Sequence, residues 1–373
     1  MSEFKHLSFP LDSSCCSSWR QVSLEDVATI TMGQSPDSKT YNLNQEGLPL
    51  LQGNADIANG VTSPKQYTSA PTKFCNTNDI VVTVRAPVGE VAIAKEKCCI
   101  GRGVCSLRAN SEAITSFLYY LLVAKKSLWN NLEQGSTFSA INSSEIKSFR
   151  ISIPSLIEQQ KIAEFFTALD EKIRIHEQKL KKLISAKDSI LRKLFKQEIR
   201  LKDKDGSDFH PWIKVKIGDI LKVKHGKDYK HLSPGKIPVM ATSGAISYVD
   251  TALCTWPCAL IGRKGTIDKP QFMDKPFWCI DTLFYTKALG NHSPLFQYYL
   301  FQTIDWKKFN EGTGLPSLSA STIESIQCSI PMEKEQQAIA NFLRIYDEKI
   351  MICSKKIEAL KQLKKAFMQR MFV

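Results

Sequence analysis

The residue types that do catalytic chemistry occur in this chain, but not at catalytic spacings. Cys254 and Cys258 form the best candidate for a metal-binding pair, yet no second Cys or His pair lies at zinc spacing. Gly101-Arg-Gly103 lacks the third glycine of a dinucleotide-binding loop, and the chain has no phosphate loop of the type G-x-x-x-x-G-K-S/T. The sequence therefore predicts no catalytic residue, no metal site and no cofactor bound by this chain.

Two further motifs bear on enzyme classes. The chain has no Pro-Pro pair, so it lacks the Asp/Asn-Pro-Pro-aromatic motif with which an amino-methyltransferase holds its target base. The charged triplets Asp170-Glu-Lys172 and Asp347-Glu-Lys349 fall in the middle of predicted helices. We interpret these triplets as charges on solvated helix faces.

Polar residues in predicted loops indicate recognition of nucleic acid instead. Arg, Lys, Asn and Gln offer the donor and acceptor pairs that match base edges in the major groove. For each residue alone, an ordinary polar loop position is the alternative interpretation, and the set is more informative than its members. The candidates for DNA contact are Gln34, Ser35, Lys39, Gln52, Asn54, Arg85, Arg102, Lys227, Lys230, Thr242, Ser243, Arg263 and Lys264.

Composition agrees with a folded protein that has an anionic partner. The 373 residues are 43% hydrophobic and 23% charged, with a formal net charge of +13. That excess suits phosphate contacts along a duplex, although a solvated helix face would give a similar excess. No apolar run is long enough to span a bilayer, and the first 18 residues lack an apolar signal core. We expect a cytoplasmic protein with reduced thiols, because its 11 cysteines suggest no disulfide framework.

An internal repeat determines the predicted architecture. Residues 134–195 match residues 311–372 at a constant offset of 177. The regions that precede these segments agree only loosely, with Trp19 and Trp212 at corresponding starts, so a variable domain precedes each similar segment. The predicted boundaries are 1–153 for the first variable domain, 154–200 for the first long helix, 201–330 for the second variable domain and 331–373 for the second long helix.

The similar segments are predicted to be long helices of about 40 residues, or about 60 Å. Their apolar residues follow alternating steps of four and three, which is typical of a coiled coil; two independent helices, each packed on its own domain, are the alternative. In an antiparallel pair we expect Ile173 to lie near Ile350. The predicted seam residues are Ile162, Phe166, Leu169, Ile173, Leu180, Leu183, Ile339, Leu343, Tyr346, Ile350, Ile357 and Leu360.

The variable segments have the pattern of mixed α/β domains. Residues 79–85 and 278–285 are rich in β-branched and aromatic residues and are predicted to be strands. Residues 115–130 and 294–309 are predicted to be helical. The predicted fold class is α+β: two α/β domains in tandem repeat, each followed by a long α-helix, with the two helices paired as an antiparallel coiled coil.

This arrangement resembles the specificity subunit of type I restriction–modification systems. The matching motifs are Trp-x-x-Val-x-Leu at 19, Trp-x-x-Val-x-Ile at 212, and Ile-Pro followed by Glu-Gln-Gln-x-Ile-Ala at 153 and 330. The resemblance implies two target recognition domains, each of which reads half of a split double-stranded DNA target. It also implies that the coiled coil sets the spacing and docks methyltransferase subunits, expected to be two.

The resemblance further implies that the chain catalyses nothing by itself. S-adenosylmethionine would belong to the methyltransferase subunits, and ATP and Mg to restriction subunits where these are present. Two alternatives remain open from the residues. One is a fused restriction–modification enzyme or lone methyltransferase; the other is a coiled-coil assembly scaffold with duplicated protein-binding domains.

Overall fold

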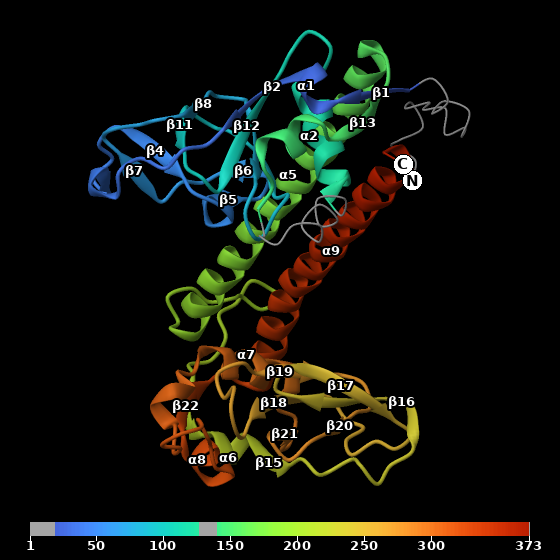
Figure 1. Ribbon diagram of the computed structural model, residues 1–373. Coiled ribbons are helices and arrows are strands. Elements are labelled where there is room, and N and C mark those ends of the chain that lie inside the picture. The colour runs from blue at the N-terminus through green and yellow to red at the C-terminus, as the bar shows by residue number, and fades with distance from the viewer. Residues whose placement is uncertain (1–18, 127–139, 373) are drawn as a thin grey trace. The chain divides into compact units, whose positions relative to one another are not determined.

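The computed structural model describes residues 19–126 and 140–372. The chain divides into two compact units: Met1–His176 with Ile357–Val373 form unit 1, and Glu177–Lys356 form unit 2. Each unit combines one α/β domain with a segment of each long helix (Figure 1). Neither long helix therefore belongs to one domain alone, which the sequence boundaries did not anticipate.

The α/β domain of unit 1 contains two larger sheets and a separate short strand pair. Within its described residues, one sheet has the order β2-β12-β9-β10-β6-β5 and the other β3-β7-β4-β11-β8, while β1 pairs with β13. The strands are β1 (Arg20–Ser23), β2 (Ala28–Met32), β3 (Tyr41–Asn42), β4 (Leu48–Leu51), β5 (Ile57–Ala58), β6 (Val61–Thr62), β7 (Gln66–Thr68), β8 (Phe74–Cys75), β9 (Ile80–Thr83), β10 (Val91–Ile93), β11 (Cys98–Ile100), β12 (Val104–Ala109) and β13 (Arg150–Ile153). The short helices are α1 (Leu24–Val27), η3 (Ser38–Thr40), η4 (Asn54–Asp56), α2 (Thr115–Ala124) and α4 (Ser143–Lys147).

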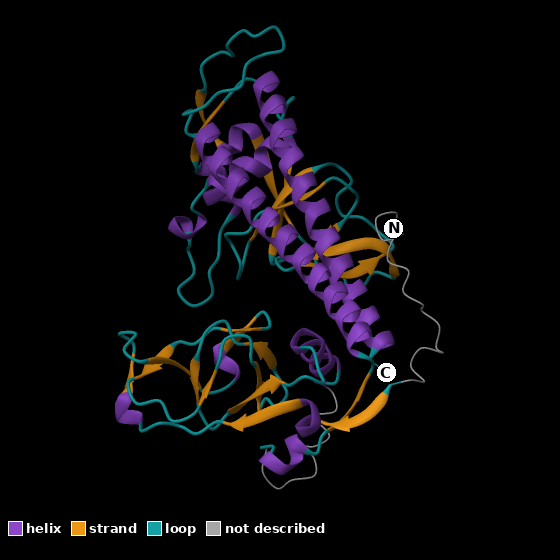
Figure 2. Cartoon of the chain, turned by 90° about the horizontal axis from the view of Figure 1, so that it is seen from above, coloured by secondary structure: helices purple, strands orange, loops and turns teal. Residues whose placement is uncertain are grey.

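Unit 2 repeats this plan with fewer strands in its two larger sheets; the strands of both units are drawn in orange in Figure 2. Its sheets have the orders β15-β21-β18-β19 and β17-β16-β20, and β14 pairs with β22 as β1 does with β13. The strands are β14 (Ile213–Lys216), β15 (Leu221–His225), β16 (Pro234–Ala241), β17 (Gly244–Val249), β18 (Cys258–Gly262), β19 (Gln271–Met273), β20 (Trp278–Cys279), β21 (Leu283–Ala288) and β22 (Gln327–Ile330). The short helices are α6 (Ile217–Ile220), α7 (Pro294–Thr303), η5 (Trp306–Phe309) and α8 (Ala320–Ser325).

The strand predictions are confirmed in one domain and corrected in the other. The strand predicted at 79–85 is present as β9, which is buried along its whole length, as a β-branched run predicts. The single strand predicted at 278–285 is wrong, because the chain turns after Cys279 and the backbone N–H of Leu283 bonds to Ile280 O at 3.0 Å. Two strands of different sheets result, β20 and β21.

The helix predictions are largely confirmed. The two long helices are α5 (Leu156–Phe195), of 40 residues, and α9 (Glu333–Met371), of 39 residues, and each begins just after an Ile-Pro pair. The segment predicted at 294–309 contains α7 and η5, and that predicted at 115–130 contains α2; residues 127–130 lie outside the described residues. The predicted fold class, two α/β domains each followed by a long helix, is thus present.

The two long helices run antiparallel within unit 1. Lys364 Nζ lies 2.6 Å from Asp170 Oδ1, and the rings of Phe165 and Phe367 lie 5.0 Å apart. Farther toward the C-terminus of α9, Phe372 stacks on Phe166 at 5.6 Å. Lower residue numbers on α5 thus face higher numbers on α9.

The end of each long helix packs into an aromatic socket of an α/β domain. In unit 1, Phe372 lies 6.5 Å from the Trp19 ring and 5.8 Å from the Phe117 ring. In unit 2, Phe195 lies 5.9 Å from the Trp212 ring and 5.2 Å from the Phe296 ring. These pairs correspond in the sequence repeat, so the last turn of a helix from one copy completes the core of the other copy's domain.

Most predicted seam residues are buried, and those near the middle of the helices are half-buried. Ile173 is buried in the same core as Leu360 of unit 1. That Ile173 lies near Ile350, which belongs to unit 2, stays a prediction. A coiled coil that is continuous over both units stays a prediction. The buried seam residues are Ile162, Phe166, Leu169, Ile173, Ile339, Leu343, Ile357 and Leu360; Leu180, Leu183, Tyr346 and Ile350 are half-buried.

Candidate nucleic-acid interface

A tight turn in the first domain brings several predicted contact residues together. The turn Gly101-Arg102-Gly103 joins β11 to β12, and Gly33 N donates a hydrogen bond to Val104 O at 3.0 Å. A Cβ atom on Gly33 would lie 2.1 Å from Gly101 O, so no larger residue fits there. The close approach places the loop that begins at Gln34 directly against the turn, because Gln34 N bonds to Ile100 O at 2.8 Å.

Side chains of neighbouring loops hold this turn in place. Ser35 Oγ accepts hydrogen bonds from Arg102 N at 3.2 Å and from Arg102 Nε at 3.3 Å. Gln52 is also adjacent, since a Cβ on Gly103 would lie 1.9 Å from Gln52 O. Arg102 remains exposed, as does Gln52. Ser35 therefore holds the Arg102 guanidinium group at its Nε atom, while the side chain stays exposed.

Arg85 joins the same group, whereas two other candidates do not. Arg85 is exposed and follows Val84, whose N–H bonds to Gly103 O at 2.9 Å. Asn54 opens η4, two residues beyond Gln52 in the sequence. Lys39 lies in η3, which Asp37 caps by accepting from Lys39 N at 3.0 Å. Among the described residues, no hydrogen bond or ion pair joins the Lys39 side chain to the turn. The group around the turn is thus Gln34, Ser35, Gln52, Arg85 and Arg102.

The second domain builds the same backbone frame with different side chains. Gly226 N donates to Leu283 O at 3.2 Å, and Lys227 N donates to Cys279 O at 2.8 Å. A Cβ atom on Gly226 would lie 1.9 Å from Ile280 O. These contacts repeat those of Gly33 and Gln34, so Lys227 occupies the position of Gln34 and the turn 280–282 occupies that of 101–103.

A second set of contacts extends this equivalence. Arg263 N donates to Thr282 O at 2.8 Å, just as Val84 N donates to Gly103 O at 2.9 Å. The residues that follow, Lys264 and Arg85, each form an isolated β-bridge, with Ser317 and Ala140 respectively. Lys264 and Arg85 are thus equivalent exposed cations beside equivalent turns.

Asp281 is a candidate that the sequence did not reveal. It is exposed and takes the middle position of its turn, where the first domain has Arg102. Arg263 Nη1 donates to the Asp281 carbonyl oxygen at 3.3 Å, which ties a predicted contact residue to this turn. The sequence signal for this equivalence was the pair of corresponding glycines, Gly33 and Gly226. Beyond them the sequence offset between the two domains changes, so the alignment did not match Asp281 with Arg102.

The remaining candidates of the second domain lie on adjacent loops. Thr242 and Ser243 form the tip between β16 and β17. Gln271 Nε2 donates to Ala241 O at 2.9 Å and to Thr242 O at 3.3 Å, which fixes the base of this tip. Lys230 is exposed in the segment between β15 and β16.

The cysteine pair lies in the core of the second domain. Cys254 Sγ and Cys258 Sγ lie 3.9 Å apart, and both residues are buried. Burial raises the pKa of the neighbouring Cys279 thiol to about 12, so this thiol stays protonated in the core. Among the residues that the structure describes, no three His, Cys, Asp or Glu side chains gather to hold a metal ion.

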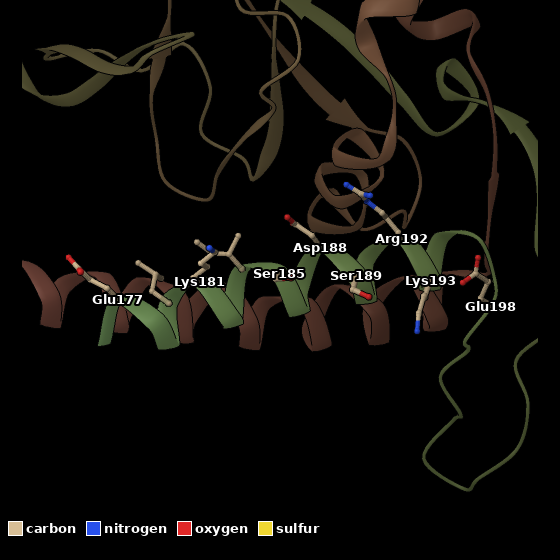
Figure 3. Close-up of a pocket in the computed structure, with 10 residues that line it drawn as sticks. Glu177, Lys181, Ser185, Asp188, Ser189, Arg192, Lys193 and Glu198 are labelled. Atoms are coloured by element: carbon tan, nitrogen blue, oxygen red, sulfur yellow. The ribbon is translucent and has the colours of Figure 1, made fainter. Parts of the chain in front are cut away.

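A surface groove lies along α5 in unit 2 and is lined by charges of both signs. Its cavity volume is about 720 Å³. Figure 3 shows acidic Glu177 and Asp188 and basic Lys181 and Arg192 along the same helix. This mixture differs from the loop groups described above, where the charged side chains around the turn of the first domain are basic.

The interpretation of the two charged triplets as solvated is wrong for their first residues. Asp170 accepts a hydrogen bond from Tyr120 Oη at 2.9 Å in addition to its ion pair with Lys364. Asp347 does the same with Tyr299 Oη at 2.6 Å and Lys187. A hydrophobic stripe places these aspartates at the edge of the helix contact, which a one-dimensional sequence pattern does not show.

Membrane insertion of a helix has no support in the described part of the chain, where no helix is both long and apolar enough to cross a bilayer.

Comparison with known proteins identifies close relatives of this architecture. A family model described as type I restriction modification DNA specificity domain matches residues 17–185 and 210–362. The putative type I restriction enzyme MjaX specificity subunit of Methanocaldococcus jannaschii is 39% identical over 188 residues, which cover 49% of this chain and 44% of that protein. The type I restriction enzyme MjaIX specificity subunit of the same organism is 24% identical over 405 residues, which cover 95% of this chain and 92% of that protein.

A solved structure shares the fold over nearly the whole length. The crystal structure of the S subunit of a type I restriction–modification system from M. genitalium aligns with a TM-score of 0.71 and 18% sequence identity, covering 98% of each chain. The likeness at this identity concerns the fold.

Proposed function

Because this chain belongs to the type I restriction modification DNA specificity family, with two such domains in tandem, we propose that each domain reads one half of a bipartite double-stranded DNA target. The chain is then a specificity subunit that carries no catalytic activity of its own. Methylation and cleavage belong to partner subunits.

The observation that carries this proposal is the pair of equivalent turns. Gly33 and Gly226 support the same backbone frame, yet the middle of the turn holds Arg102 in one domain and Asp281 in the other. Arginine donates a pair of hydrogen bonds to guanine, and aspartate accepts from the amino group of cytosine. A common frame with different side chains is what two domains need to read two different half-sites.

Membership of the family supports a proposal for the partners and cofactors. We propose that the long helices set the distance between the half-sites and dock two methyltransferase subunits, and that restriction subunits join this assembly. S-adenosylmethionine, ATP and Mg bind in those partner subunits. The basic net charge of +13 supports the DNA contact, because it favours association with phosphate.

The proposal is tested by a domain exchange. Residues 20–133 are replaced by the corresponding segment of another family member, the chain is co-expressed with its methyltransferase partner, and methylated adenines are mapped across the host DNA. We expect one half-site to change while the other half-site persists. A change in both half-sites, or in neither, contradicts separate reading by the two domains.

Two controls separate the other function classes. Incubation of the purified chain alone with labelled S-adenosylmethionine and mixed-sequence DNA should transfer no methyl group; transfer would identify an enzyme. Absence of any sequence preference with the methyltransferase partner present would favour a protein-binding scaffold.

A further inference from the structure

Three structural elements meet at one carboxylate in unit 1. Asp170 lies on α5, and its Oδ2 accepts a hydrogen bond from Tyr120 Oη of the domain helix α2 at 2.9 Å. Lys364 of α9 donates to both carboxylate oxygens, at 2.6 Å and 2.8 Å. The Lys364 ammonium also lies 5.3 Å from the centroid of the Tyr120 ring. A domain helix and two long helices are therefore joined by three side chains, Tyr120, Asp170 and Lys364, which we name the first register cluster.

Unit 2 contains the corresponding second register cluster, formed by Tyr299, Asp347 and Lys187. Lys187 Nζ lies 2.6 Å from Asp347 Oδ1, and Tyr299 Oη donates to Asp347 Oδ2 at 2.6 Å. The ammonium lies 5.2 Å from the Tyr299 ring centroid and also donates to Gln302 Oε1 at 3.4 Å. The same tyrosine, aspartate and lysine thus meet in unit 2, on residues that correspond in the sequence repeat.

Each lysine stands at a seam position of a mostly apolar stripe. Lys187 is only 8% exposed, and it lies among buried apolar residues such as Leu191 and Leu194. An apolar seam by itself tolerates a shift of one heptad, because leucine and isoleucine layers pack on one another in several registers. A paired lysine at such a position, buried for Lys187 and half-buried for Lys364, does not, because a shift would separate its charge from the carboxylate and leave it unpaired.

The two clusters require the same register. Lys187 follows Asp170 on α5 by the same number of residues as Lys364 follows Asp347 on α9. In a coiled coil that is continuous over both units, a single antiparallel alignment would satisfy both ion pairs, and a slip that breaks one would break the other.

The tyrosines extend this constraint to the domains. Burial is the main reason that the pKa of Tyr120 and that of Tyr299 are raised, so both phenols remain hydrogen-bond donors. Each tyrosine lies on the helix that packs its domain against the long helices, in α2 or α7. The orientation of each domain is therefore linked to the same carboxylate that selects the register.

We propose that Lys187 and Lys364 are positioning residues that select the helix register, tie each domain to it through Tyr299 and Tyr120, and so determine the gap between the two half-sites. This inference rests on the proposed function. The lysines act through the helices and have no assigned contact with DNA.

The test compares lysine variants by the targets that they methylate. The double variant Lys187→Met with Lys364→Met keeps long, flexible side chains but removes the charges that select the register. A slip of one heptad moves one helix along the other by about 10 Å, which corresponds to about three base pairs. With the methyltransferase partner, we expect unchanged half-sites, a lower share of methylated sites at the native gap, and new sites whose gap differs by about three base pairs.

A matched control and a rescue variant make the result specific. Arg344→Met removes an exposed ion pair with Glu348 on the same helix, and should retain the single native gap. The exchange variant Asp170→Lys with Lys364→Asp rebuilds the first ion pair with reversed polarity and should also retain the native gap. If the methionine variant loses its helical circular dichroism signal, the gaps methylated by the exchange variant test the proposal instead.

The outcomes distinguish this inference from the proposed function. A single native gap at undiminished methylation in the folded methionine variant would overturn the role of the lysines, as would an exchange variant that is folded yet methylates several gaps. Failure of the unaltered chain to direct methylation to any bipartite target would instead overturn the proposed function.

Discussion

Gln159 Oε1 accepts a hydrogen bond of 2.9 Å from the backbone N–H of Ile114, the residue that precedes the domain helix α2. The Gln159 amide also donates to Pro154 O at 3.1 Å, so a single buried side chain joins the start of the long helix to the start of the domain helix. Gln336 repeats this role in unit 2 with the backbone N–H of Ser293 at 3.2 Å. The repeated Glu-Gln-Gln motif is thus explained by its middle residue.

Replacement of Gln159 by Ala should destabilise unit 1. The change leaves buried backbone groups without partners, and each such group costs about 1–3 kcal/mol. The measurement is urea unfolding followed by circular dichroism. Gln160→Ala is the control, because Gln160 is exposed and, within the described residues, its side chain bonds along its own helix to Glu164. Equal midpoints for the two variants would contradict the role assigned to Gln159.

Replacement of Gly226 by Ala should disturb the turn of the second domain. The added methyl group would meet the Ile280 carbonyl oxygen at 1.9 Å, and overpacking of this kind costs about 1–3 kcal/mol. We expect a lower melting temperature and weaker methylation with the partner subunits present. Gly314→Ala is the control, since no atom lies within 4 Å of its added Cβ. A variant as active and stable as this control would show that the close approach is not required.

Arg102→Ala and Asp281→Ala should each alter the preference within a single half-site. A good base contact contributes about 1–3 kcal/mol of discrimination against the wrong base, which is about tenfold to a hundredfold in relative methylation. Methylome mapping should show relaxed sequence at one position, in the first half-site for Arg102 and in the second for Asp281. Lys39→Ala, which alters an exposed cation in η3, should leave the preferred sequence unchanged. Identical targets for all three variants would exclude the turns from base reading.

Insertion of four residues after Lys182 should change the gap or abolish assembly. The insertion lengthens α5 by about 6 Å and rotates its distal part by about 40°. It also lengthens the interval between Asp170 and Lys187 on α5, which then differs from the interval between Asp347 and Lys364 on α9. Methylome mapping reports the gap, which we expect in the native protein to be roughly five to eight base pairs, about one helical turn between half-site centres. An unchanged gap at undiminished activity would show that the helices do not set the spacing.

Alkaline pH should weaken the folded state through the buried phenols. Burial raises the pKa of Tyr119 and of Tyr298 to about 12, from an ordinary value of 10.0. The folded chain then holds protons that the unfolded chain has lost, so the free energy of unfolding is fully retained below about pH 10 and falls as the pH rises toward about 12. Urea midpoints measured across this range should decline less steeply in the variant Tyr119→Phe with Tyr298→Phe. Superimposable pH profiles would contradict this assignment.

The sequence by itself determined the repeat and the two long helices. These features depend on local patterns: Ile-Pro before each helix, apolar steps of four and three, and a constant offset between the copies. It also selected most of the loop residues that surround the two turns, because Arg102, Lys227 and Arg263 belong to residue types suited to base edges.

Only the tertiary structure decided how these parts are combined. The equivalence of Asp281 with Arg102 depends on backbone contacts made by Gly226 and Gly33, which insertions between the domains conceal in the sequence. The register of the helices depends on Lys364 and Asp170, which are far apart in the chain and meet in the fold. An apolar stripe specifies that a helix pairs, but several registers bury it equally well. The choice among those registers requires polar groups whose partners only the folded chain brings within reach.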